Sequence, residues 1–186
     1  MRKLRVFNTV SVDGYFCDEH GDMSWAHKQD AEWESFTSDN ASGDSVLLFG
    51  RITYELMAGY WPTHAASEAA PDVAEAMNAL PKIVFSNTLA EPTWSNTDVV
   101  NGDIAAAVQS MKEQAGPDMV IMGSGTIVSQ LTEARLIDGY QIVVSPIVLG
   151  HGRTMFEGVS EKVPLRLLES RAFENGNVVQ RYEPAE

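Results

Sequence analysis

The chain has 186 residues, of which 44% are hydrophobic, and a formal net charge of −13 at pH 7. This length suffices for one sizeable core, so we expect a single domain over residues 1–186. The acidic balance disfavours nucleic acid or an anionic membrane as the main partner. Cys17 is the only cysteine, and the first residues lack a signal-peptide pattern, so we predict a reducing, cytoplasmic setting.

Strand and helix patterns alternate along most of the chain. The apolar run 4–12 predicts a central strand that ends at a turn, and residues 29–38 place Trp33 and Phe36 at helical spacing. The following expected elements are a strand at 45–49, helices from Thr53 and from Pro71, strands at 82–86 and 98–100, a helix at 102–115, a strand at 118–122, a helix at 124–134 and a long strand at 140–149.

The pattern changes in the last part of the chain. Residues 165–173 and 178–182 flank Glu174-Asn175-Gly176-Asn177, and Asn-Gly is a strong hairpin signal. Alternating strands and helices indicate a largely parallel sheet with helices on both faces. We therefore predict an α/β protein with three α-β-α layers, whose mixed, mostly parallel sheet ends in an antiparallel hairpin.

A glycine pair follows the strand expected at 118–122. The segment Met122-Gly123-Ser124-Gly125-Thr126 lies where that strand gives way to a helix. Glycines let the backbone approach a ligand, and the free N–H groups of a helix start can bind an anion such as a phosphate. The third glycine of the Rossmann fingerprint is missing, since Val128 occupies its position. A tight turn without a ligand is the alternative.

Two further strand ends carry similar groups. Gly50-Arg51-Ile52-Thr53 combines a glycine, a guanidinium and a hydroxyl, which suit phosphate, although a surface salt bridge is the alternative for Arg51. Ser86-Asn87-Thr88 follows the apolar stretch Lys82–Phe85 of the next expected strand. Ligands of open α/β sheets bind outside the carboxyl ends of the strands, so we expect the three segments to converge on one crevice.

Asp30 is the leading candidate for contact with a substrate. It lies three residues before Trp33 at the start of a helix, so its carboxylate can border an aromatic pocket and supply a proton. The alternative is that Asp30 only offsets the helix dipole. Asp13, before Gly14, is a second candidate, for which a plain turn role is the alternative.

Several other chemistries lack their minimal parts. The four histidines, His20, His27, His64 and His151, form no His-x-x-x-His or His-x-His pair, so no metal site is predicted. There is no Gly-x-Ser-x-Gly elbow and no glycine-rich Lys-Ser/Thr loop, which argues against hydrolases and nucleoside triphosphatases.

Five motifs, in this order, resemble the free-standing proteins of the dihydrofolate-reductase-like superfamily, which are related to the C-terminal reductase domain of the bifunctional riboflavin-biosynthesis deaminase-reductase. The motifs are Ser11-Val12-Asp13-Gly14-Tyr15, Gly50-Arg51-Ile52-Thr53-Tyr54-Glu55, Ile83-Val84-Phe85-Ser86, Gly123-Ser124-Gly125 and Pro146-Ile147-Val148-Leu149-Gly150. The resemblance implies NADPH bound across the strand ends and hydride transfer to a C=N bond or a carbonyl.

The resemblance also implies residue roles. The cofactor-binding residues would be Gly50, Arg51, Thr53, Ser86 and Asn87 on the adenosine side, and Gly123, Ser124, Gly125 and Thr126 around the pyrophosphate. Dihydrofolate reductases carry a Met-Pro-Trp loop followed, five residues after the tryptophan, by the carboxylate that binds the pterin. Met23-Ser24-Trp25 is followed at that spacing by Asp30, and Trp33 matches an aromatic residue of that family. The substrate-binding residues would be Asp13, Trp25, Asp30 and Trp33.

The chain departs from the riboflavin-type pattern at two positions. That domain usually has a lysine and an aspartate where this sequence has Phe7 and Met57, and no zinc-deaminase half occurs in these 186 residues. The favoured hypothesis is an NADPH-dependent reductase of a small heterocyclic (pterin- or pyrimidine-like) or carbonyl substrate. The alternatives are the 5-amino-6-(5-phosphoribosylamino)uracil reductase of riboflavin biosynthesis and a catalytically inactive dimeric nucleotide-binding or sensor protein.

The resemblance further implies a homodimer. The apolar strand Ile142–Leu149 and the closing hairpin could supply the surface, and burial of the same residues inside the monomer is the alternative.

Overall fold

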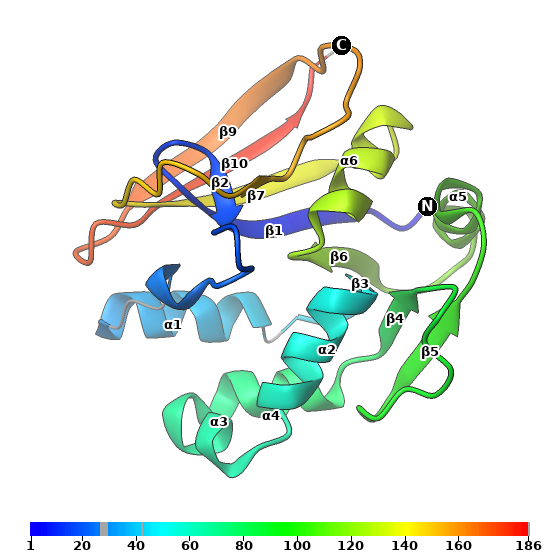
Figure 1. The fold of residues 1–186 in the computed structure, drawn as a ribbon, viewed down its shortest axis with the longest axis horizontal. Helices are drawn as coiled ribbons and strands as arrows, with labels where there is room; N and C mark the ends of the chain where they lie inside the picture. Colours follow the sequence, from blue (N-terminus) through cyan, green and yellow to red (C-terminus); the bar gives the residue numbers. More distant parts are fainter. Residues whose placement is uncertain (27–29, 42, 186) are drawn as a thin grey trace.

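The computed structural model of the protein describes residues 1–26, 30–41 and 43–185. An eight-stranded sheet in the order β5-β4-β3-β6-β1-β7-β10-β9 forms its centre (Figure 1). Its strands are β1 (Leu4–Ser11), β3 (Ser45–Gly50), β4 (Lys82–Phe85), β5 (Thr97–Val100), β6 (Asp118–Met122), β7 (Gly139–Ser145), β9 (Leu165–Ala172) and β10 (Val178–Pro184). A separate antiparallel pair joins β2 (Tyr15–Cys17) to β8 (Arg153–Thr154).

The six strands from β5 to β7 run parallel, whereas β10 is antiparallel to both β7 and β9. The Asn-Gly turn therefore closes the hairpin that the sequence predicts. β1 is central because it pairs with β6 on one side and β7 on the other. The predicted fold class, a mixed, mostly parallel sheet with an antiparallel C-terminal hairpin, is confirmed.

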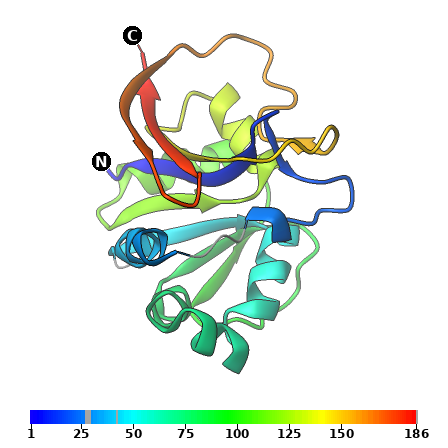
Figure 2. The ribbon, with the colours of Figure 1, turned by 90° about the vertical axis from the view of Figure 1, so that its left-hand side faces the viewer.

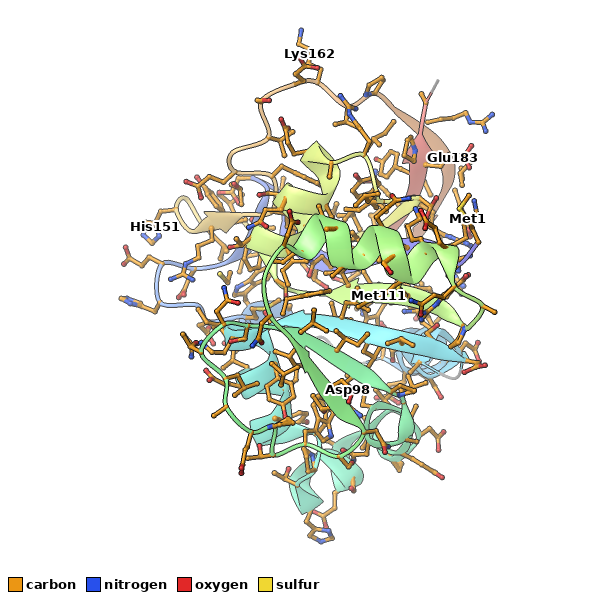
Figure 3. The ribbon with its side chains drawn as sticks, turned by 90° about the vertical axis from the view of Figure 1, so that its right-hand side faces the viewer. Met1, Asp98, Met111, His151, Lys162 and Glu183 are labelled. Carbon is orange, nitrogen blue, oxygen red and sulfur yellow. The ribbon has the colours of Figure 1, made fainter. Side chains whose placement is uncertain are left out.

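Helices cover both faces of the sheet (Figures 1 and 2). They are α1 (Ala31–Ala41), α2 (Arg51–Tyr60), α3 (His64–Ala69), α4 (Pro71–Ala79), α5 (Ile104–Glu113) and α6 (Gly125–Glu133), with a short 3₁₀ turn, η1 (Ser24–Ala26). α5 and α6 pack on one face, and α1, α2 and α4 pack on the other. Figure 3 shows α5 lying across the sheet, with Asp98 on the edge strand β5 and with His151 and Lys162 on projecting loops.

The alternation of side chains along β3 explains this two-sided core. Successive residues of a strand point to opposite faces. Val46 and Leu48 therefore pack with α5 and α6, whereas Leu47 and Phe49 pack with α2 and α4. A strand buried on both faces needs a continuous apolar run, which is the pattern of Ser45–Gly50.

The end of one strand differs from the prediction, and the predicted start of one helix is not tested. The strand expected at 140–149 is wrong in its second half, because β7 ends at Ser145. Pro146 has no N–H to donate to a sheet, so the chain leaves the ladder there. The helix expected at 29–38 is α1, and its predicted first residue, Gln29, lies outside the described residues. In the part of the chain that the structure describes, no helix has the length and apolar character needed to cross a membrane.

Candidate functional site

Two helix starts meet at the carboxyl edge of the sheet. β3 and β6 are parallel neighbours, and α2 leaves β3 toward one face while α6 leaves β6 toward the other. The Gly50 N–H donates to Ser124 Oγ (2.9 Å), and the Ser124 N–H donates to Thr53 Oγ1 (3.1 Å). Two of the three predicted segments are therefore in direct contact at a point where the sheet connections change direction, which is where α/β proteins place their ligands.

The N-cap residue of α2 and that of α6 do not cap their own helices. Gly50 precedes α2 and Ser124 precedes α6, and neither position supplies a side-chain hydrogen bond to the first turn. Uncapped N–H groups carry the positive end of the helix dipole, which favours an anion. Two such starts side by side provide a donor set that fits the pyrophosphate of a dinucleotide.

The glycines of this loop are required for packing within the protein. A Cβ on Gly123 would lie 2.7 Å from Thr53 Cγ2, and one on Gly125 would lie 2.7 Å from Phe16 Cε1. Gly123 and Ser124 also have φ angles of 62° and 59°. The expectation that these glycines open space for a ligand is therefore incomplete, because protein side chains occupy that space. Their contact with a ligand stays a prediction.

The third segment lies at the next strand end. Phe85 is the register partner of Gly50, so Ser86 follows at the same edge of the sheet. Its Oγ accepts hydrogen bonds from the N–H groups of Thr88 (3.1 Å) and Leu89 (3.0 Å), and Asn87 Oδ1 accepts from the Gly102 N–H (2.9 Å). Ser86 holds its own turn, and Asn87 joins that turn to the loop after β5. Both side chains therefore already have partners, and their part in one shared crevice stays a prediction.

Arg51 is the first residue of α2 and is partly exposed. Its Nη1 donates to both carboxylate oxygens of Glu55, at 2.9 Å each, across one turn of the helix. This is the surface salt bridge considered as the alternative. Exposed pairs of this type contribute only about 0.3–0.5 kcal/mol, so the guanidinium can exchange Glu55 for a phosphate.

Asp30 has the capping role that was the alternative for it, and its contact with a substrate stays a prediction. Its Oδ1 accepts the Trp33 N–H (2.8 Å), which caps the start of α1. Its Oδ2 is buried and accepts no hydrogen bond from the described residues. A buried acceptor without a donor costs about 1–3 kcal/mol, so such an atom in a native protein calls for an explanation. A ligand N–H group would provide one.

An aromatic cluster lies beside Asp30. Trp33 and Phe36 of α1 contact Phe173, which follows β9, with ring centroids 5.1 Å apart in each pair. The Arg171–Glu32 ion pair (2.8 Å) joins the same two elements. The Trp33 ring is therefore held by packing against Phe36 and Phe173, while its backbone N–H donates to Asp30.

Trp25 lies in η1, where its Nε1 donates to the Asp22 carbonyl (3.2 Å) within its own loop. Residues 27–29, between Trp25 and Asp30, lie outside the described part of the chain. A substrate-binding role for Trp25 stays a prediction.

Asp13 closes a loop. Its carboxylate accepts the N–H groups of Leu149 (3.1 Å) and Gly150 (2.7 Å). A hydrogen bond from the Ser11 side chain, together with these two, lowers the pKa of the Asp13 carboxyl to about 2. These contacts fit the turn role, because they join the end of β1 to the loop after β7.

The two positions that depart from the riboflavin-type pattern are apolar contacts. Phe7 packs against the cluster of Val143, Phe173 and Val179. Met57, a residue of α2, packs against the apolar cluster that this helix covers, and its Sδ accepts the Trp61 Nε1–H (3.2 Å). No charged group replaces the lysine or the aspartate at these positions.

Asn8 is a site residue that the sequence reasoning missed. It is 3% exposed, and its Nδ2 donates to the Gly123 carbonyl (3.0 Å) and contacts Met155 Sδ (2.8 Å). The sequence did carry a signal, because alternate residues of a strand share a face. Asn8 lies on the same face of β1 as the buried Leu4, Val6 and Val10, so it is a polar residue at a core-facing position. Such groups are buried only with hydrogen-bond partners.

Within residues 1–26, 30–41 and 43–185, no cluster of three or more His, Cys, Asp or Glu side chains could hold a metal ion.

The sheet order and the helices on both faces define a dihydrofolate-reductase-like fold. Dihydrofolate reductase from Enterococcus faecalis, complexed with NADP(H) and RAB-propyl, superposes with a TM-score of 0.67 at 13% identity, over 99% of this chain and 97% of that one. A putative riboflavin biosynthesis protein from Shewanella sp. PV-4 superposes with a TM-score of 0.75 at 20% identity, over 99% of each chain.

Sequence comparison gives the family. The model of the RibD C-terminal domain matches residues 2–179, so the chain belongs to the RibD C-terminal domain family. The uncharacterized protein YyaP of Bacillus subtilis (strain 168) is 24% identical over 177 residues, which are 95% of this chain and 92% of the relative. The resemblance inferred from the five motifs is confirmed.

Proposed function

We propose that the protein is an NADPH-dependent reductase that transfers a hydride to a small heterocyclic, pterin- or pyrimidine-like, substrate or to a carbonyl compound. The observation that carries this proposal is the pair of uncapped helix starts joined by the Gly50–Ser124 and Ser124–Thr53 hydrogen bonds. A dinucleotide needs two closely spaced anion sites, and these two helix starts would offer them at the usual place in an α/β sheet.

Each part of the cofactor would be bound by a different group of residues. The first N–H groups of α6, from Gly125 and Thr126, would bind the pyrophosphate, and the start of α2 with Thr53 would bind the adenosine side. Arg51 would leave Glu55 and pair with the 2′-phosphate that distinguishes NADPH from NADH. NADPH, when bound, supplies the hydride, and the protein supplies orientation and exclusion of water.

The substrate side is proposed at Asp30. Its unpartnered Oδ2 would accept an N–H or amino group of a planar ring lying near Trp33. Phe7 and Met57 supply no charge for a phosphoribosyl group, which favours a smaller, less polar substrate.

The direct test is a titration of the purified protein with NADPH, followed by nicotinamide fluorescence. We expect saturable binding at submillimolar cofactor, and its absence would refute the proposal. Arg51→Ala should weaken NADPH more than NADH, since only NADPH carries the extra phosphate. Equal losses would refute the role of Arg51 but not the rest of the site.

Family membership supports a second candidate, the 5-amino-6-(5-phosphoribosylamino)uracil reductase step of riboflavin biosynthesis. Growth rescue of a strain that lacks this step tests it, and no rescue would leave the smaller substrates favoured. NADPH binding without oxidation across pterin, pyrimidine, flavin and quinone panels would instead favour a sensor that has lost turnover.

We also propose that the protein is a cytoplasmic homodimer that self-associates through β9. Every residue of this edge strand is exposed, including Leu165, Leu167 and Leu168. A long edge strand with exposed leucines is a template for pairing with another chain. β7 is a poorer candidate, because its backbone already pairs with β1 and β10.

A further inference from the structure

The carbonyl and amide groups around the Gly123–Ser124 peptide are all held from outside the loop. The Ser124 N–H donates to Thr53 Oγ1 (3.1 Å), and the Gly123 carbonyl accepts from Asn8 Nδ2 (3.0 Å). Because the two ends of one peptide group point in opposite directions, these two contacts together fix the plane of that peptide.

The conformation that they hold is unusual. Gly123 and Ser124 have φ angles of 62° and 59°, so two consecutive residues are left-handed. Left-handed backbone is unfavourable for a residue with a side chain such as Ser124, so the surrounding contacts must stabilise it. α6 starts directly after this turn, and the turn therefore sets where its first N–H groups point.

The side chain of Asn8 is fixed in the orientation that holds this turn. It lies on the central strand β1 and is 3% exposed, so packing fixes its side chain. Its amide has two hydrogens, and both have acceptors: the Gly123 carbonyl and Met155 Sδ. The opposite orientation of the amide would bring its oxygen against the Gly123 carbonyl oxygen, which is repulsive.

We propose that Asn8 is a positioning residue for the phosphate-binding turn: through the Gly123 carbonyl it orients the start of α6 toward the pyrophosphate of the dinucleotide. This inference rests on the proposed function. Asn8 touches neither cofactor nor substrate in this scheme. It acts only through the peptide that it holds.

The test separates this role from general stability. Asn8→Leu keeps the branched shape of the side chain and removes the donor. We expect it to weaken the binding of NADPH and ADP-ribose about tenfold, by analogy with the smaller losses seen when residues that orient metal ligands are removed. Binding of 2′-AMP, which carries the 2′-phosphate but no pyrophosphate, should stay unchanged. If Asn8→Leu does not fold, Asn8→Ser replaces it, since a hydroxyl one bond shorter cannot reach Gly123.

Thr132→Val is the matched control. It removes another buried hydrogen bond, between Thr132 Oγ1 and the Tyr140 hydroxyl (3.1 Å), near the far end of the same helix. We expect this variant to lower Tm without changing the Kd of NADPH or ADP-ribose.

Three results would overturn the inference: unchanged NADPH and ADP-ribose binding in the Asn8 variant, an equal loss of 2′-AMP, or the same loss in Thr132→Val. No NADPH binding by the unmodified protein would overturn the proposed function together with the inference, so the two failures are distinguishable.

Discussion

Gly123 offers a quantitative check on the turn before α6. Gly123→Ala places a methyl group on a residue with a φ of 62°, 2.7 Å from Thr53 Cγ2. The left-handed backbone costs a residue with a Cβ about 1–2 kcal/mol. Relieving the contact with Thr53 costs about 1–3 kcal/mol more, because the turn is already closely packed.

The expected total is about 3 kcal/mol of unfolding free energy, which lowers Tm by roughly 6–12 °C in a protein of this length. Urea unfolding monitored by tryptophan fluorescence measures it. Gly59→Ala is the control, because Gly59 lies inside α2 with nothing within 4 Å of its Cβ position. That change should stabilise the protein by about 0.5–1 kcal/mol.

A second variant separates the two costs. Thr53→Ser removes the clashing Cγ2 but keeps the Oγ1 that accepts the Ser124 N–H. When it is combined with Gly123→Ala, it should therefore restore the unfolding free energy that was lost to the contact with Thr53. The loss caused by the left-handed backbone should remain. A loss from Gly123→Ala no larger than 0.5 kcal/mol, about the limit of an ordinary surface change, would refute the reasoning. A double variant as unstable as Gly123→Ala would show that Thr53 is not the obstacle.

Three further outcomes are expected. Tyr54→Phe removes the acceptor of the buried Trp94 N–H (2.9 Å), so chemical denaturation should show a loss of about 1–3 kcal/mol, and no loss would contradict this bond. The pKa of the Asp13 carboxyl is lower in the folded state than in the unfolded state, so the unfolded state takes up this proton first as the pH falls. The stabilisation of the fold by ionised Asp13 is therefore complete above about pH 4 and disappears toward pH 2. Measurements of stability against pH should show this loss in the unmodified protein but not in Asp13→Asn. Leu167→Lys on β9 should convert a dimer into a monomer in light scattering coupled to gel filtration, and an unchanged mass would argue against that edge.

Much of the fold followed from local patterns. The apolar run of β3 and the Asn-Gly turn of the closing hairpin are determined by short stretches of sequence, and both are found where they were predicted. The convergence of the Gly50 and Gly123 segments was also predictable, because parallel strands end at a common edge. The binding roles of these residues stay predictions.

The remaining features depend on partners distant in sequence. Asn8 and Gly123 are 115 positions apart, and Asp13 and Gly150 are 137 apart. The sequence around each of these residues does not reveal which distant residue it contacts. The reason for Gly125 was missed in the same way, since the ring of Phe16 that excludes a Cβ belongs to β2. The early end of β7 was the exception, because Pro146 was visible in the sequence.

The hydrogen bond between Gly50 and Ser124 closes a loop of 74 residues. A molecule bound across both helix starts would act as a reversible cross-link on that loop. The unfolded chain has no such pair of helix starts, so all of the binding free energy would add to the stability of the folded state. Residues 51–123, which include α3 and α4 far from the crevice, would then gain protection from hydrogen exchange together with the turn, as one cooperative unit.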